Sequence, residues 1–361
     1  MENTEEMNTM LSQLRDAAFI VQDGIITQCN AAAVQRQIPA GTDVRAILET
    51  GRAEYDAFSG GKLYLTLKVE DAPCSACVTK VGDRHLFVIE QEQDAAELQS
   101  MALTAQILRT PLSNVMTVAD QLFPLSYFDN EPEAQEQIAR INRGLYQMLR
   151  IVCNMSDAYR YSCESSPRTE LIDITAFLRE LICGNEELIG YAGIRLHYEG
   201  PAQSTYTLVD TEKLERAIGN MLSNAIKFTP RGGTIHIRLT RKDKMLYLTV
   251  QDSGEGIADA AKHQLYSRYQ RMPGLEDSRF GVGLGILLIC QTAAAHGGTV
   301  LMESGKDFGL KLTMSLAIRQ PSDPGVRSPM IHVDYAGDRD HRLLELADCL
   351  PADAFRRENV N

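Results

Sequence analysis

Two stretches of this 361-residue chain repeat apolar residues at alternating intervals of three and four. The first set is Leu98, Met101, Ala105, Leu108, Leu112, Val115, Ala119 and Leu122. The second set is Ile138, Ile141, Leu145, Met148, Val152, Met155 and Tyr159. This spacing is typical of helices that pack along one apolar seam. A loop containing Pro124 separates the two sets, so residues 93–165 are predicted to form an antiparallel helical hairpin. Because one hairpin leaves a wide apolar face, two copies should pair into a homodimer with a four-helix bundle.

Residues 1–92 have the pattern of a small α+β domain. Two short apolar runs flank Asp23-Gly24, which predicts a β-hairpin, and residues 62–69 and 85–89 read as further strands. The order of strand, turn, strand, short helix and three strands resembles a PAS-type sensor domain over residues 10–92. That resemblance implies a sensor role, but no residue here indicates a ligand. A packing or dimerisation module is the alternative.

The charge balance limits the partners of the chain. Lys and Arg number 36 against 48 Asp and Glu, which gives a formal net charge of −12. A general nucleic-acid or anionic-membrane binder needs a basic surface, so we expect neither. The first residues lack the basic and apolar regions of a signal peptide, and the most apolar stretch, residues 281–298, is too interrupted to span a membrane. A cytoplasmic protein without a membrane span is therefore expected.

The cysteines fit a reducing compartment. Most of the eight stand alone, and only Cys74 and Cys77 form a CxxC pair. One such pair, without a second pair or nearby histidines, favours structural thiols. Redox or metal binding is the alternative for these two residues.

The remaining chain has a mixed α/β pattern over residues 166–319, followed by a tail at 320–361. Helices are expected near 174–188, at 210–225 and after Gly283. Strands are expected at 194–198, 206–209, 234–240, 246–250, 299–302 and 310–316. In the tail, residues 341–350 have an apolar spacing that could dock as a helix, with no role assigned.

Four features follow one another in this α/β region. Asn220, Asn224 and Lys227 share one face of the helix at 210–225 and its continuation. Amide oxygens suit Mg²⁺, and a lysine supplies a point charge for phosphate. Asp252 and the glycines Gly254 and Gly256 follow a strand, where a carboxylate can accept from an adenine amino group.

The other two features lie further along. A loop at 262–280, which contains three arginines, one glycine and His263, is suited to close over a nucleotide. The run Gly281, Val282, Gly283, Leu284 and Gly285 leads directly into a helix, whose N-terminal amides form an anion site. Each feature alone is weak, but the four in this order are specific.

The sequences NMLSNAIKFTPRGGTI, DSGEGI, LYSRYQR, GVGLGI and AHGGTVLMES resemble the ATP-binding domain of sensor histidine kinases. That domain belongs to the GHKL superfamily, which includes the Hsp90 chaperones, DNA gyrase and MutL. The resemblance covers residues 168–317 and implies an α/β two-layer sandwich that binds ATP and Mg²⁺. It also implies that Asn224 is the metal ligand. The residues for which it implies an ATP-binding role are Asn220, Asn224, Lys227, Asp252, Gly254, Gly256, Gly281, Gly283, Leu284 and Gly285.

Two further residues are interpreted through the same resemblance. Asn220 stands where Hsp90-type ATPases carry the glutamate that activates water, and an amide cannot act as that base. Fast ATP hydrolysis is therefore disfavoured. His296 lies in the AHGG turn, where the family implies a structural role.

The hairpin resembles the dimerisation and phosphotransfer (HisKA-like) domain of the same kinases, whose signature reads Ser-His-Glu-Leu-Arg-Thr-Pro-Leu. Residues 105–112 read AQILRTPL, so five of eight positions agree. Gln106 replaces the phosphoacceptor histidine and Ile107 replaces its acidic partner. Glutamine has no basic ring nitrogen to accept a phosphoryl group. No histidine lies between His85 and His197, so the hairpin contains no substitute. The seam places Ala105 and Leu108 inward and Gln106 toward solvent, and Pro111 should kink the helix.

Three hypotheses follow from these observations. The first is a dimeric, multidomain, histidine-kinase-like protein that binds Mg·ATP without its own phosphoacceptor and acts as a nucleotide-dependent switch. The second is an active kinase that phosphorylates a partner, either the histidine of a heterodimeric partner kinase or a Ser/Thr. The third is a dimeric scaffold with a vestigial nucleotide pocket. A response regulator or a partner kinase is the partner that the resemblance implies.

Overall fold

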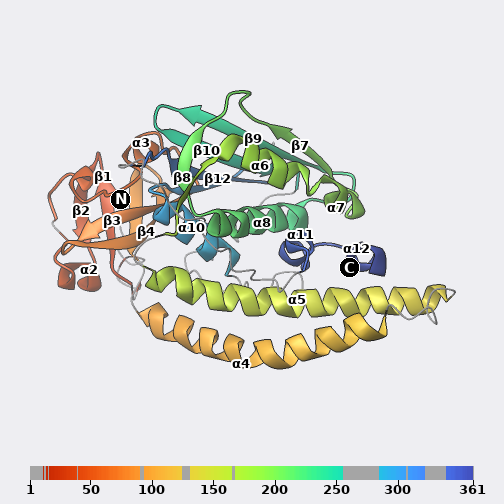
Figure 1. Ribbon diagram of the computed structural model, residues 1–361. Coiled ribbons are helices and arrows are strands. Elements are labelled where there is room, and N and C mark those ends of the chain that lie inside the picture. The colour runs from red at the N-terminus through yellow and green to blue at the C-terminus, as the bar shows by residue number, and fades with distance from the viewer. Residues whose placement is uncertain are drawn as a thin grey trace.

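The computed structural model describes residues 16–38, 40–89, 93–123, 131–164, 167–254, 284–305, 308–321 and 339–360, together with positions 11 and 14. Figure 1 shows a layered arrangement within these ranges. Strands lie on one side, the helices α8 and α10 lie beneath them, and a long helical hairpin forms the opposite side.

The N-terminal part follows the predicted order. The Asp23-Gly24 turn, in which both residues have positive φ, joins the first two strands. The strand predicted at 62–69 has those bounds. Its elements are β1 (Ala18–Gln22), β2 (Ile25–Cys29), α2 (Ala31–Gln35), the short 3-10 helix η1 (Val44–Ala46), α3 (Arg52–Asp56), β3 (Lys62–Val69), β4 (Ala72–Val81) and β5 (Arg84–Ile89). The sensor role drawn from the PAS resemblance stays a prediction.

The two cysteines of the CxxC pair both lie on β4. Successive side chains of a strand point to opposite faces, so Cys74 and Cys77, three apart, point away from each other. Cys74 packs against the buried cluster of the N-terminal sheet. The two sulfurs therefore do not converge on one site. Within the described part of the chain, no group of three or more His, Cys, Asp or Glu side chains is arranged to hold a metal ion.

The predicted hairpin consists of α4 (Gln93–Leu122) and α5 (Pro132–Cys163). Pro111 lies inside α4, and the helix is visibly bowed in Figure 1. Every second member of each seam is buried between the helices, as for Ala105 and Leu112. Of the intervening members, those in the middle of the hairpin point outward: Leu108 is 47% exposed and Val115 is 54% exposed. The expectation that Leu108 faces inward is therefore wrong for the single chain.

The α/β region contains the predicted helices and strands, with one break. The helix expected at 174–188 is two helices, because α6 ends at the Gly184 C-cap and Asn185 starts α7. The elements are β6 (Glu170–Asp173), α6 (Ile174–Cys183), α7 (Glu186–Tyr191), β7 (Arg195–Glu199), β8 (Tyr206–Val209), α8 (Thr211–Phe228), β9 (Thr234–Lys242), β10 (Met245–Asp252), α10 (Gly285–Ala295), β11 (Val300–Ser304) and β12 (Leu310–Ala317).

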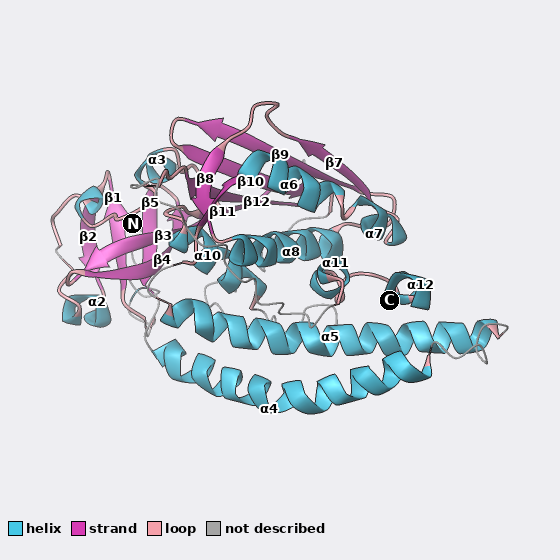
Figure 2. Ribbon diagram, viewed as in Figure 1, coloured by secondary structure: helices cyan, strands magenta, loops and turns pink. Residues whose placement is uncertain are grey.

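One sheet runs through both the N-terminal part and the α/β region (Figure 2). Its order is β2-β1-β5-β4-β3-β11-β12-β10-β9-β7, while β6 and β8 form a separate pair. The junction is antiparallel and short, with Tyr64 opposite Val300 and Lys62 opposite Met302. A Cβ on Gly61, which has φ +87°, would lie 2.3 Å from the Met302 carbonyl oxygen. The absence of a side chain at Gly61 therefore permits the two parts to pair closely.

Residues 339–360, which we call the C-terminal segment, dock between the hairpin and α8. The segment contains α11 (His341–Glu345), the 3-10 helix η5 (Ala352–Phe355) and α12 (Arg357–Val360). Leu344 and Phe355 are fully buried in the same apolar cluster as residues of α5 and α8. Burial of each such side chain contributes about 1.5–3 kcal/mol. The predicted docking helix exists, although α11 covers only the first half of 341–350.

Among the helices of the described ranges, none combines the length and the apolar character that crossing a membrane requires.

Candidate functional site

The helix α8 carries three of the predicted site residues, Asn220, Asn224 and Lys227. It begins after Asp210, whose Oδ1 accepts a hydrogen bond from the Lys213 backbone amide at 3.1 Å and so caps the helix. Asn220 is buried, whereas Asn224 and Lys227 are partly exposed. The helix therefore presents these polar groups along one side while its apolar residues enter the core.

Asn220 is already hydrogen-bonded on both sides of its amide. Its Nδ2 donates to the Arg216 carbonyl at 2.8 Å, and its Oδ1 accepts from Arg150 Nη2 of α5 at 3.2 Å. A Cβ on Gly285 would lie 2.9 Å from this Oδ1. The start of α10 thus approaches α8 at Asn220, which brings the first and last of the four predicted features together.

Lys227 forms an ion pair with the C-terminal segment. Its Nζ lies 3.3 Å from Asp348 Oδ2, and only 9% of its side chain is exposed. Burial lowers the pKa of Lys227, and the Asp348 carboxylate opposes this effect. The lysine predicted to approach phosphate is therefore paired with an anion of the protein itself.

Asp252 lies at the end of β10 and is held by backbone amides. Its Oδ1 accepts from the Gly254 amide at 2.9 Å, and its Oδ2 accepts from the Leu310 amide at 3.2 Å. Burial raises the pKa of this carboxyl group, and both hydrogen bonds lower it in part. A carboxylate oxygen can accept more than one hydrogen bond, so Asp252 retains capacity for an adenine amino group.

Two glycines allow the chain to close around Asp252. A Cβ on Gly254 would lie 2.2 Å from the Phe228 carbonyl oxygen at the end of α8. A Cβ on Gly309 would lie 2.0 Å from Asp252 Oδ1. Sequence reasoning selected Gly254 but missed Gly309, because Gly309 lies outside the recognised motifs. Together they place Asp252 beside the C-terminal end of the helix that carries Lys227.

The N-terminus of α10 begins at Gly285, after Leu284 as N-cap residue. A leucine side chain cannot accept hydrogen bonds from the first amides of the helix, which are the groups that bind anions. Of the predicted glycine-rich run, the structure describes Leu284 and Gly285. Leu284 lies in a buried cluster with Leu98 of α4 and Ala158 of α5, and Gly285 lies beside Asn220 of α8. Gly256, Gly281, Gly283 and the loop 262–280 lie outside the described residues.

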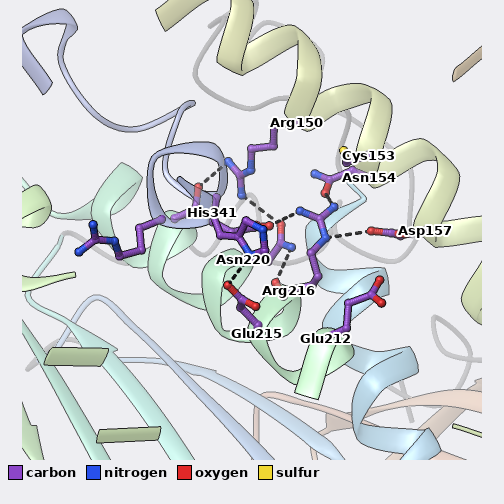
Figure 3. A network of polar contacts seen from close by, with 12 residues as sticks. Arg150, Cys153, Asn154, Asp157, Glu212, Glu215, Arg216, Asn220 and His341 are labelled. Carbon is purple, nitrogen blue, oxygen red and sulfur yellow. Dashed lines mark hydrogen bonds and ion pairs between the residues drawn. The ribbon is translucent and has the colours of Figure 1, made fainter. Parts of the chain in front are cut away.

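A buried network of arginines links α8 to the hairpin, and sequence reasoning missed it (Figure 3). Arg216 of α8 is fully buried and donates to Asp157 Oδ2 at 2.9 Å and to Asn154 Oδ1 at 2.6 Å. It also pairs with Glu345 of the C-terminal segment. One available signal was the spacing of Arg150, Asn154 and Asp157, which places three polar groups on one face of α5.

The phosphoacceptor position lies on the surface of α4. Gln106 is exposed, as predicted, and Ile107 is 73% exposed. A side chain at position 106 could therefore be reached by a separate domain. The glutamine present cannot use that accessibility for phosphotransfer.

His296 is buried and uses both ring nitrogens. Nε2 accepts from the Asp210 amide at 2.9 Å, and Nδ1 donates to the Thr292 carbonyl at 2.7 Å. Burial lowers its pKa, which favours the neutral imidazole. The predicted structural role is consistent with these contacts.

Comparison with known proteins identifies the ATPase domain. Residues 209–320 match the family described as histidine kinase-, DNA gyrase B- and HSP90-like ATPase. Within the matched region lie α8, Asp252 and the start of α10.

Relatives of the longer region are histidine kinases. Hybrid signal transduction histidine kinase D of Dictyostelium discoideum is 27% identical over 248 residues, which are 66% of this chain and 16% of that protein. Sensor histidine kinase WalK of Bacillus subtilis (strain 168) is 24% identical over 65% of this chain and 39% of WalK. Histidine protein kinase DivJ of Caulobacter vibrioides is 29% identical over 62% of this chain and 38% of DivJ. The aligned region therefore spans well under half of each relative.

Among solved structures, full-length ShkA in complex with AMPPNP has a TM-score of 0.49 and 20% identity, and it covers 63% of this chain and 47% of ShkA. Residues 209–320 thus form a domain of the histidine kinase-, DNA gyrase B- and HSP90-like ATPase family, and the longer region that contains them is similar to histidine kinases.

Proposed function

We propose that this protein is a cytoplasmic, dimeric, histidine-kinase-like protein that binds Mg·ATP along α8 and acts as a nucleotide-dependent switch without phosphorylating its own hairpin. The observation that carries this proposal is a contrast between two sites. Gly254 and Gly285 approach α8 closely, as a nucleotide site requires, and Asp252 is held next to Gly254 by the hydrogen bond from its amide. Gln106 and Ile107 instead stand exposed where phosphotransfer chemistry would occur.

In this proposal, the residues of α8 and its surroundings have separate tasks. Asp252 accepts from the adenine amino group, Asn224 supplies an amide oxygen for Mg²⁺, and the first amides of α10 receive phosphate oxygens. Mg²⁺ would neutralise phosphate charge. Asn220 cannot take a proton from water, so the bound nucleotide is expected to persist rather than be hydrolysed rapidly.

The dimer rests on the outward half of the hairpin seam. Leu108, Val115 and Leu122 recur at intervals of seven on α4 and are each about half exposed. Ile141 and Met148 recur in the same way on α5 and are 48% and 49% exposed. Because the other half of each seam is filled by the opposite helix, a second copy would cover this half and complete a four-helix bundle.

A second candidate function is phosphorylation of a partner protein. The hydrogen bonds from backbone amides to Asp252 favour this function over a scaffold with a vestigial pocket, because a chain that binds no nucleotide would have no need for a buried carboxylate there. Incubation with radiolabelled ATP and candidate partner kinases or response regulators separates the two functions. Label on a partner supports the kinase, and bound but untransferred nucleotide supports the switch.

Isothermal titration with Mg·ATP tests the primary proposal. We expect saturable binding that is stronger for ATP than for GTP. Asp252→Asn should weaken the binding of Mg·ATP at least tenfold. Asp243→Asn, in the β9–β10 turn at φ +52°, is the matched control and should bind like the wild type. No binding of Mg·ATP at millimolar concentration would contradict the proposal.

A further inference from the structure

Asp348 of the C-terminal segment bridges two cations from different helices. Its Oδ2 accepts from Arg150 Nη1 of α5 at 2.7 Å and from Lys227 Nζ of α8 at 3.3 Å. Arg150 is 2% exposed, and the side chains of Lys227 and Asp348 are 9% and 13% exposed. One carboxylate oxygen therefore satisfies two nearly buried positive charges at once.

Neighbouring contacts fix the position of Asp348. Asp340 caps α11 by accepting from the Arg342 and Leu343 amides at 2.8 and 3.3 Å. Leu346 and Leu350, on either side of Asp348, are fully buried. The Glu345–Arg216 pair joins the same segment to α8. The carboxylate is thus held by a docked and capped segment.

The two cations are suited to phosphate as well as to carboxylate. A guanidinium donates through a planar fork and a lysine ammonium acts as a point charge, which are the two usual ways of binding phosphate. Arg150 also donates to Asn220 Oδ1 and to Ser223 Oγ at 2.9 Å, so it lies against the face of α8 that carries Lys227. Without an anion between them, Lys227 and Arg150 would repel each other in a poorly solvated place.

We propose that Asp348 occupies the place of a nucleotide phosphate between Lys227 and Arg150, and that Mg·ATP binds by displacing it. This inference rests on the proposed ATP-binding function and adds Arg150, from the hairpin, as a phosphate-contact residue. The C-terminal segment then competes with nucleotide. Because the segment also pairs with α4 through Arg339 and Asp120, its release would loosen the contact between the ATPase domain and the hairpin.

The first test compares nucleotide affinity in the full chain. Asp348→Asn removes the competing charge, so we expect Mg·ATP to bind at least fivefold tighter while adenosine, which has no phosphate, binds as in the wild type. Asp353→Asn is the matched control, because Asp353 lies in the same segment and pairs with the exposed Arg356. If the wild-type protein binds Mg·ATP and Asp348→Asn changes this affinity by less than twofold, or weakens it, the inference is overturned and the proposed function stands. Absence of Mg·ATP binding in both proteins would overturn both.

The second test needs no substitution and therefore holds even if Asp348→Asn misfolds. Hydrogen exchange of the wild-type protein is followed with Mg·ATP, with adenosine and without ligand. We expect Mg·ATP, but not adenosine, to increase exchange in residues 339–350 at least threefold. Unchanged or slower exchange in this segment under saturating Mg·ATP would overturn the displacement.

Discussion

His296 Nε2 accepts a hydrogen bond from the backbone amide of Asp210 at 2.9 Å, which ties the end of α10 to the start of α8. The same ring donates from Nδ1 to the Thr292 carbonyl. Only the neutral imidazole can make both contacts, because protonation of Nε2 would place a donor against the Asp210 amide. The two helices that carry the candidate nucleotide site are therefore joined by a side chain whose contacts depend on its protonation state.

We expect stability to decrease as the pH falls below about 6.5. The pKa of His296 is lowered by burial, so the unfolded chain binds a proton before the folded chain does. The stability contributed by the neutral ring is present above the unfolded pKa and is lost below it, by up to about 1.4 kcal/mol per pH unit until the folded pKa is reached. The pKa of His85 is also lowered, and its effect has the same sign.

Chemical denaturation at pH 7.5 and 5.5 measures this dependence. His296→Gln should lower stability by about 1–3 kcal/mol at pH 7.5 and flatten the pH slope. His197→Gln, at an exposed position of β7, should preserve the slope. If the free energy of unfolding of His296→Gln depends on pH as steeply as that of the wild type, His296 does not contribute to the pH dependence.

The outward half of the α4 seam should control assembly. Val115→Glu places a charge in the proposed bundle interface, where an unpaired buried charge is costly, so the dimer should become a monomer. Thr117→Glu, at an exposed position of the same helix, should remain dimeric. Light scattering at matched concentrations measures the mass, and a dimeric Val115→Glu would rule out this face.

The junction between β3 and β11 should be sensitive at Gly61. Gly61→Ala combines a positive φ with a Cβ that would lie 2.3 Å from a carbonyl oxygen of β11. Gly82→Ala is the control, because Gly82 also has positive φ (+64°) but no atom lies within 4 Å of its added Cβ. Both should cost about 1–2 kcal/mol for the left-handed backbone, and Gly61→Ala should cost more. Faster hydrogen exchange of the β11 backbone amides in Gly61→Ala but not in Gly82→Ala would confirm the role of the junction. Equal exchange in the two variants would refute it.

Restoring the acceptor tests whether the ATPase domain remains competent. The double variant Gln106→His, Ile107→Glu should gain acid-labile label from radiolabelled ATP, because both positions are exposed on α4 and tolerate polar side chains. Gln121→His, exposed on the same helix, should gain none. Bound ATP without label in the double variant would indicate that the chain has lost more than its acceptor.

Local sequence patterns predicted most of the fold, because strand alternation and helix capping depend on neighbours in the chain. The bounds of β3 and the Asp23-Gly24 hairpin are examples. The seam period identified the apolar residues of α4, but Leu108 shows that it could not separate the side facing α5 from the outer side. That distinction depends on the angle at which two helices pack.

The candidate site was predictable only in part. Asp252 and Gly285 belong to motifs that a linear reading can find. The pairing of Arg150 with Asp348 joins residues 198 positions apart, and nothing local to either residue indicates the other. Such a contact depends on where the C-terminal segment docks, which is a property of the assembled core.

The pairing of arginines with distant acids also has a consequence for synthesis. Arg150 and Arg216 emerge from the ribosome long before Asp348 and Glu345, which follow them by 198 and 129 residues. During that interval, Arg216 has Asp157 of α5 as a counter-charge, but Arg150 contacts only the uncharged Ser223 and Asn220 of α8, so burying Arg150 is strongly unfavourable. The hairpin and ATPase domain are therefore expected to dock late in translation or after it, and contacts of such long sequence separation slow that final step.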